Sequence, residues 1–212
     1  MIIGSIISIA ALLTVAVALF INQPSFGRTP RGDRLERVKQ SPNYRNGAFQ
    51  NLHETTLMTS DRGWFEGILD FLFRKIEGLK PGQPVKAVKT NLRKIGKDEE
   101  VLVWFGHSSY LIQTGGKRIL VDPVFSMASP VSFVNKAFKG TDIYQPEDMP
   151  DIDYLVISHD HWDHLDYTTV KKLKDRIGTV ICPLGVGEHF EYWGFDKERV
   201  TELDWDEDAN LN

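Results

Sequence analysis

The sequence holds one cysteine in 212 residues, Cys182. A single thiol excludes an internal disulfide framework and a zinc site built from cysteines alone. Basic residues are not in excess either: the formal net charge is -4, which argues against a general nucleic-acid binder. Hydrophobic residues make up 42% and charged residues 25% of the chain. That balance is typical of a globular protein and excludes a disordered or fibrous one.

Charged side chains are also absent from residues 1–21. A helix of this length spans roughly 30 Å, the thickness of a bilayer core. No Lys or Arg precedes the apolar run, as one normally does in a signal peptide, so we favour a retained transmembrane anchor. A cleaved signal is the alternative, with Ala16 and Ala18 as a weak cleavage site, and it would export the protein to the periplasm or outer membrane.

The remaining charge is divided unevenly along the chain. Residues 22–97 hold 15 Lys and Arg against 7 Asp and Glu, whereas residues 98–212 hold 10 against 22. The cations that follow the apolar run directly are Arg28, Arg31, Arg34, Arg37 and Lys39. By the positive-inside rule they keep the body of the protein cytoplasmic, and they would also attract anionic lipid headgroups. A topology signal alone would explain them equally well.

Residues 22–97 are predicted to form a basic connector that contains one amphipathic helix. Frequent Pro and Gly make residues 22–60 look extended and rich in turns. Residues 62–79 repeat apolar side chains at a helical period. We interpret this helix as part of a core. A helix lying on a membrane surface is the second interpretation, because Trp64 and Phe65 accompany Arg74.

From residue 98 the pattern becomes one of short strands. They are expected at residues 101–105, 110–114, 117–121, 153–158, 179–182 and 200–203, with a tight hairpin at Gly115–Gly116. A helix is expected over residues 168–177, ended by Gly178, and a shorter one over 186–193. Antiparallel hairpins followed by alternating strands and helices predict an α/β (α+β) sheet with helices on one face.

The stretch Ser158-His-Asp-His-Trp-Asp-His-Leu-Asp166 follows one of these strands and contains three of the chain's six histidines. Imidazole and carboxylate groups suit zinc and related divalent metals. In a tight turn, His159 and His161 can aim at one metal, and Asp163 and His164 can aim at a second. Two such metals could activate water for attack on an ester. A polar loop with chance histidines is the alternative, and the density of histidines argues against it.

The motif His159-Asp-His-Trp-Asp-His164 resembles the signature of the metallo-β-lactamase superfamily of dinuclear metallohydrolases. Flanking segments resemble the branch of N-acylphosphatidylethanolamine-hydrolysing phospholipases D: residues 104–113, 120–130, 149–158, 182–185 and 202–205. The resemblance implies an αββα sandwich, of which residues 98–212 would be the N-terminal part. The expected organisation is an anchor at 1–21, a connector at 22–97 and this hydrolase portion.

The resemblance also implies roles for individual residues. His159 and His161 would hold the first zinc ion, and Asp163 and His164 the second. Asp163 is also the candidate catalytic residue. Asp122 would support the histidine loop from behind the ligands.

Four other polar residues receive weaker expectations. His107 would lie near the metal pocket, with simple packing as an equal alternative. Asp160 and Asp166 are expected to cap the loop, and Asp166 suits the N-cap of the following helix. His189 is expected on a helix surface.

The complete family site needs three further ligands, a histidine, a bridging aspartate and a second histidine, which residues 165–212 do not supply in matching positions. We therefore expect the chain to be the N-terminal half of an enzyme. The implied function is a zinc-dependent phosphodiesterase that cuts an N-acylated phosphatidylethanolamine at a membrane. The alternatives are a hydrolase of a lactone or another phosphoester, and an inactive metal-binding fragment.

Overall fold

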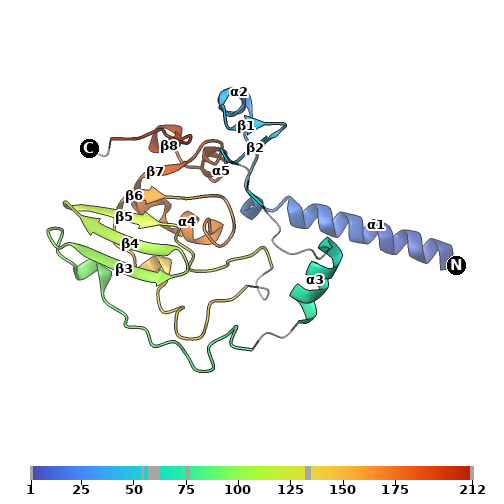
Figure 1. Cartoon of the computed structure of the whole chain (residues 1–212), viewed down its shortest axis with the longest axis horizontal. Helices are drawn as coiled ribbons and strands as arrows, with labels where there is room; N and C mark the ends of the chain where they lie inside the picture. Colours follow the sequence, from blue (N-terminus) through green and yellow to red (C-terminus); the bar gives the residue numbers. More distant parts are fainter. Residues whose placement is uncertain (1, 54, 57–62, 75–76, 132–134, 211–212) are drawn as a thin grey trace.

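A computed structural model describes residues 2–53, 55–56, 63–74, 77–131 and 135–210 (Figure 1). Its centre is a sheet of six strands that follow one another in chain order. The strands are β3 (Val101–Gly106), β4 (Ser109–Thr114), β5 (Lys117–Val121), β6 (Ile152–Val156), β7 (Ile177–Pro183) and β8 (Val200–Leu203). Every predicted strand is therefore confirmed, within a few residues at its ends.

The pairing of these strands changes halfway across the sheet. β3, β4 and β5 are antiparallel, and Gly115 and Gly116 make the tight turn between β4 and β5 with positive φ angles of 55° and 75°. From β5 to β8 the neighbours are parallel. Helices α4 (Tyr167–Leu173) and α5 (Gly187–Tyr192) connect successive parallel strands. Right-handed crossovers that advance in one direction put both helices on the same face, as the sequence predicts.

The core lies between this sheet and the two helices. It is built from aliphatic and aromatic side chains that lose nearly all contact with solvent, including Leu120, Leu155, Val170, Leu173, Val180 and Phe190. Short 3-10 turns lie around it at Leu92–Lys94 (η2), Pro146–Asp148 (η3), Lys174–Arg176 (η4) and Lys197–Arg199 (η5).

The helix predicted over residues 168–177 ends earlier than expected. Helix α4 stops at Leu173, and Ile177 already pairs with Ile152 as the first residue of β7. Gly178 is thus a strand residue and not a helix cap. A Cβ atom at this position would lie 2.6 Å from the backbone oxygen of Asp153, so the glycine allows β6 and β7 to approach. The helical spacing of apolar residues in the sequence extends beyond the end of α4, because Ile177 also packs into the core, but as a residue of β7.

Helix α1 (Ile2–Ile21) forms the N-terminal end of the chain, and its described side chains are exposed. By length and composition it can cross a membrane, and a signal sequence would satisfy the same criteria. In Figure 1 it projects away from the sheet. The apolar helix is confirmed, and its use as anchor or signal remains a prediction.

The first part of the connector is not the extended segment that its Pro and Gly content indicated. It contains the turn η1 (Pro24–Phe26), helix α2 (Gly32–Gln40) and a small hairpin of β1 (Tyr44–Arg45) and β2 (Ala48–Phe49). Counting proline and glycine residues does not take ion pairs into account, and ion pairs hold this part of the connector in a folded form.

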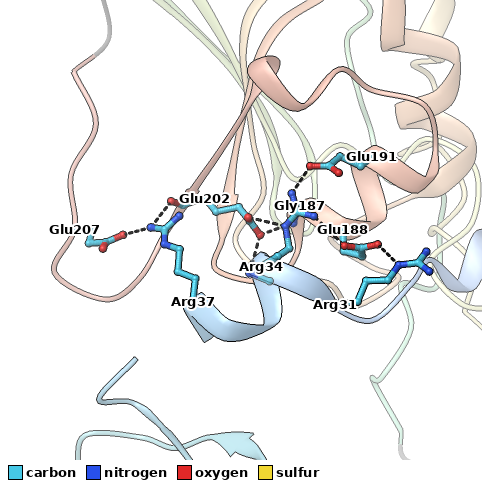
Figure 2. Close-up of polar contacts among 9 residues, drawn as sticks. Arg31, Arg34, Arg37, Gly187, Glu188, Glu191, Glu202 and Glu207 are labelled. Atoms are coloured by element: carbon cyan, nitrogen blue, oxygen red, sulfur yellow. Dashed lines mark hydrogen bonds and ion pairs between the residues drawn. The ribbon is translucent and has the colours of Figure 1, made fainter. Parts of the chain in front are cut away.

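Arg31, Arg34 and Arg37 lie one helical turn apart and all reach the acidic half of the chain (Figure 2). The guanidinium of Arg34, only 10% exposed, pairs with three carboxylates: Glu188, Glu191 and Glu202. Burial alone would lower the pKa of Arg34, but these carboxylates raise it above its ordinary value. Arg34 is therefore not available to lipid headgroups. Part of the positive charge of residues 22–97 instead neutralises carboxylates of residues 98–212.

Helix α3 (Trp64–Phe73) confirms a helix within residues 62–79 but not its assignment to a core. Among its described side chains, Trp64, Phe65 and Phe73 are each at least two-thirds exposed. In Figure 1 the helix lies apart from the six-stranded sheet. Positions 54, 57–62 and 75–76 of the connector lie outside the described residues.

Candidate metal centre

The histidine motif lies in the loop between β6 and α4. A tight turn closes over it, since the backbone N–H groups of His164 and Leu165 both donate to the carbonyl of His161, at 2.9 and 2.7 Å. The turn folds His164 back onto the earlier histidines. At its end, Asp166 caps α4 by accepting hydrogen bonds from the N–H groups of Thr168 and Thr169, as predicted.

The turn gathers the imidazole rings of the motif. The ring centroid of His159 lies 4.6 Å from that of His161 and 3.9 Å from that of His164. Asp163 lies beside His164 in the sequence, and both belong to a group whose ligand atoms lie within 4.8 Å of one another. The structure thus brings the four predicted ligand residues into one cluster. Their assignment to two separate metals remains a prediction.

Asp122, the residue directly after β5, supports this cluster through contacts with His164 and Ser158. Its carboxylate is almost fully buried, and Oδ2 lies 2.8 Å from Nδ1 of His164. The backbone N–H and the hydroxyl of Ser158 donate to the same carboxylate at 2.7 and 2.6 Å. Because an ionised carboxylate only accepts hydrogen bonds, this contact assigns the proton of a neutral His164 to Nδ1 and leaves the lone pair on Nε2, which faces His107. This is the arrangement that orients a metal-binding histidine.

Ser158 extends the same network to His159. Its hydroxyl donates to Asp122, so it can accept a hydrogen bond from Nδ1 of His159, 3.0 Å away. This assigns the proton of His159 to Nδ1 and leaves Nε2 free as well. Burial lowers the pKa of His159, and the neighbouring His164 and His161 lower it further. A neutral imidazole is the form that binds metal.

His107 joins the cluster from the turn between β3 and β4. Its Nε2 lies 3.3 Å from Oδ2 of Asp163 and 3.2 Å from Nε2 of His164. The side chain is 60% exposed, so packing, the alternative weighed for it, does not explain its position. Its φ of +45° is unusual for a residue with a side chain.

These groups fit a divalent metal by chemistry and by position. His107, Asp163 and His164 each offer one ligand atom to a common centre, and imidazole with carboxylate suits zinc and related metals. The one thiol, Cys182, is buried, and burial raises its pKa, which excludes it as a nucleophile or ligand here.

Sequence reasoning missed two partners of the loop. His189, expected on a helix surface, is only 14% exposed in its side chain and lies 3.4 Å from Asp160. This contact lowers the pKa of Asp160. Phe26 packs edge-on against Trp162. No spacing rule joins residues so distant in the chain, so only the fold reveals these contacts.

Comparison with known proteins gives a consistent picture. Residues 117–212 match the model of the beta-lactamase superfamily domain. An uncharacterized protein of Mycobacterium tuberculosis is 37% identical over 176 residues, which is 82% of this chain and 47% of that protein. The chain thus spans about half the length of this curated relative.

Two further relatives carry functional names. N-acyl-phosphatidylethanolamine-hydrolyzing phospholipase D 1 of Caenorhabditis elegans is 35% identical over 118 residues, 51% of this chain and 32% of that protein. A metal-dependent hydrolase of Aeropyrum pernix is 38% identical over 64 residues, 30% of this chain and 22% of that protein. The region that matches the family model includes the histidine loop and strands β5 to β8, so this part of the chain is similar to a beta-lactamase superfamily domain.

Proposed function

We propose that this chain forms the metal-binding portion of a hydrolase that cleaves a phosphodiester in an N-acylated phosphatidylethanolamine. The observation that carries the proposal is the buried Asp122, whose contact with Nδ1 of His164 leaves Nε2 of that ring on the side of His107 and Asp163. Burying a carboxylate is costly unless hydrogen-bond donors surround it, and here one of those donors is an imidazole of the metal loop.

We assign the residues of the loop and its partners to metal-binding and supporting roles. His159 and His161 would hold one metal ion, and Asp163 and His164 a second. A divalent metal in such a site acts as a Lewis acid toward a phosphoryl oxygen and lowers the pKa of water. Asp122 and Ser158 keep the imidazoles in the tautomers that binding requires, and His107 lies beside Asp163 and His164.

The substrate assignment has two supports. The similar protein from Caenorhabditis elegans is named for this phospholipid hydrolysis. In addition, the exposed helix α1 can hold the chain at a membrane, and α3 exposes Trp64 and Phe65 nearby in the connector. Amphiphilic substrates reside in membranes, so an enzyme fixed there meets them directly.

Membrane attachment itself is part of the proposal. We place α1 in the membrane as a retained anchor, with the hydrolase portion on the cytoplasmic side. Cell fractionation followed by intact-mass measurement tests this: an anchored chain stays in the membrane fraction and keeps residues 1–21. A soluble periplasmic product that has lost these residues would establish the exported alternative.

The activity is tested on the full chain purified in detergent. We expect bound metal by elemental analysis, and release of N-acylethanolamine and phosphatidic acid from vesicles that contain the N-acylated phospholipid. His161→Ala should abolish both metal retention and hydrolysis. His53→Ala, which removes an exposed histidine outside the cluster, should leave both unchanged.

Each other outcome has a defined meaning. Hydrolysis of lactones or other phosphoesters in place of the phospholipid would reject the substrate while keeping the metal site. Hydrolysis by His161→Ala at the normal rate would reject the metal assignment. Metal retention without any hydrolysis would mean that this chain is an inactive metal-binding fragment.

A further inference from the structure

The histidine loop presents alternate side chains to two environments. His159, His161 and Asp163 belong to the metal cluster, whereas the intervening Asp160 and Trp162 contact residues outside it. Both outside contacts lead to the segment at residues 20–28, which begins in the last turn of the apolar helix α1. The loop is therefore held from two sides.

The first contact is aromatic. The ring of Trp162 packs edge-on against Phe26, with centroids 5.3 Å apart. Phe26 packs in the same way against Phe20, in the last turn of α1, again at 5.3 Å. Edge-to-face pairs have a preferred geometry, so this chain of rings fixes the loop relative to the end of α1.

The second contact is polar and passes through His189. Its Nδ1 accepts a hydrogen bond from the backbone N–H of Arg28 at 2.8 Å. The proton of the neutral ring is therefore on Nε2, which can donate to Oδ2 of Asp160, 3.4 Å away. The imidazole of His189 thus joins the N-terminal segment to the metal loop: Nδ1 contacts the N–H of Arg28, and Nε2 contacts the carboxylate of Asp160.

The approach of the segment to His189 requires a glycine. Gly27 has a φ of +67°, and a Cβ atom there would lie 1.9 Å from Nδ1 of His189. Any side chain at this position would push the segment and the imidazole apart. The position combines a backbone conformation that favours glycine with a contact that excludes every other residue.

The segment is fixed to the domain at further points. The indole N–H of Trp193 donates to the carbonyl of Pro24 at 2.8 Å. Downstream, the pairs of Arg34 with Glu188 and Glu202 hold α2 against α5 and β8 (Figure 2). These contacts make residues 20–28 a fixed part of the domain surface.

We propose that residues 20–28 and His189 form a clamp that positions the histidine loop and links the end of α1 to the metal site. His189 and Phe26 are positioning residues, because they touch Asp160 and Trp162 and not the predicted ligands. The inference rests on the proposed metal site for its effect on binding, but the clamp itself is a property of the metal-free chain.

The test uses the full chain in detergent and two readouts. Hydrogen exchange at the amides of residues 158–166, measured without metal, reports the clamp. Zinc affinity, measured by competition with a chromophoric chelator, reports its effect on the site. His189→Ala, Phe26→Ala and Gly27→Ala should each speed exchange in the loop and weaken zinc binding about tenfold, the low end for groups that support metal ligands.

Two conservative variants separate the halves of the imidazole. His189→Gln keeps a donor near the Nε2 position for Asp160, whereas His189→Asn keeps an acceptor near Nδ1 for the N–H of Arg28. Each should recover part of the loss in His189→Ala, since each restores one of two contacts. His53→Ala is the matched control and should behave as wild type in both readouts.

The outcomes distinguish failure of the clamp from failure of the metal site. Wild-type exchange rates over residues 158–166 in both His189→Ala and Phe26→Ala would overturn the clamp. Faster exchange in a protein that binds no zinc would support the clamp and reject the metal site. If a variant loses its global fold by circular dichroism, His189→Gln and His189→Asn decide the matter by the same exchange measurement.

Discussion

Oδ2 of Asp122 lies 2.8 Å from Nδ1 of His164, although 42 residues separate them in the chain. The strand that carries Asp122 and the strand that precedes the histidine loop are parallel neighbours, β5 and β6. Their ends therefore meet at one edge of the sheet, where a buried carboxylate can support a ligand from behind. Several measurable consequences follow from this and from the contacts around it.

Asp122→Asn should weaken zinc binding about 10–100-fold, the range for partners of metal-ligating histidines. Asparagine tolerates the left-handed backbone at this position, where φ is +41°, so the substitution removes the charge and replaces one of the two accepting oxygens with an NH2 donor. A chelator competition titration measures the affinity. Asp151→Asn, at an exposed position, is the control, and equal affinities in the two variants would contradict a role for Asp122.

Arg34→Met should lower the free energy of unfolding by about 3 kcal/mol, because it removes the cation paired with the buried Glu202 and leaves the buried Glu188 paired with Arg31 alone. Arg37→Met is the matched control. Its pair with Glu207 is nearly half exposed, so its loss should cost about 0–1 kcal/mol. Urea unfolding measures both variants. Similar losses in the two variants would mean that the ion pairs of Arg34 in Figure 2 contribute no more to stability than the exposed pair of Arg37 with Glu207.

Asp204 should make stability depend on pH in the acid range. Burial alone would raise its pKa, but hydrogen bonds from Ser41, Asn43 and the N–H of Trp205 lower it below its ordinary 3.8. A carboxylate whose pKa is lower in the folded state stabilises the fold at pH values above its ordinary pKa. This contribution is lost as the pH falls through the lowered pKa.

Asp204→Asn should therefore cost more stability at pH 6 than at pH 3. Denaturant unfolding at the two values measures the difference between wild type and variant, and Asp151→Asn controls for a general change in charge. A cost that stays constant between the two pH values would show that the charge of Asp204 is not the source.

Gly178→Ala should destabilise the sheet by about 1–3 kcal/mol, because the added methyl group meets the backbone oxygen of Asp153 at 2.6 Å. Gly82→Ala, where the added atom meets nothing within 4 Å, should change stability by less than about 0.5 kcal/mol. Thermal unfolding compares the two. A neutral Gly178→Ala would indicate that β6 and β7 can separate without loss.

Much of the fold could be read from residue patterns with a short range. Alternating and continuous apolar runs predicted the six strands, and the glycine pair predicted the turn between β4 and β5. These succeed because strand burial and tight turns depend on neighbouring residues. The boundary between α4 and β7 was not predicted. Ile177 is buried in the core as a strand residue, and its spacing from Leu173 also fits a helix.

The connector shows where short-range patterns fail. Proline and glycine indicated an extended segment, but α2 forms where three arginines meet carboxylates more than 150 residues away. The apolar period of α3 indicated a core helix, yet Trp64 and Phe73 are exposed. Periodicity records which face of a helix is apolar and not what covers that face.

The sequence by itself determined the chemical inventory of this protein: an apolar N-terminal helix, an α/β pattern, and a histidine–aspartate loop with the donors of a metal site. Local composition and spacing fix these features. Only the tertiary structure decided which distant groups hold that loop, with Asp122 and Ser158 beneath it, and His189 and Phe26 beside it. Such contacts depend on how strands and helices pack in space, and no rule of spacing along the chain encodes that packing.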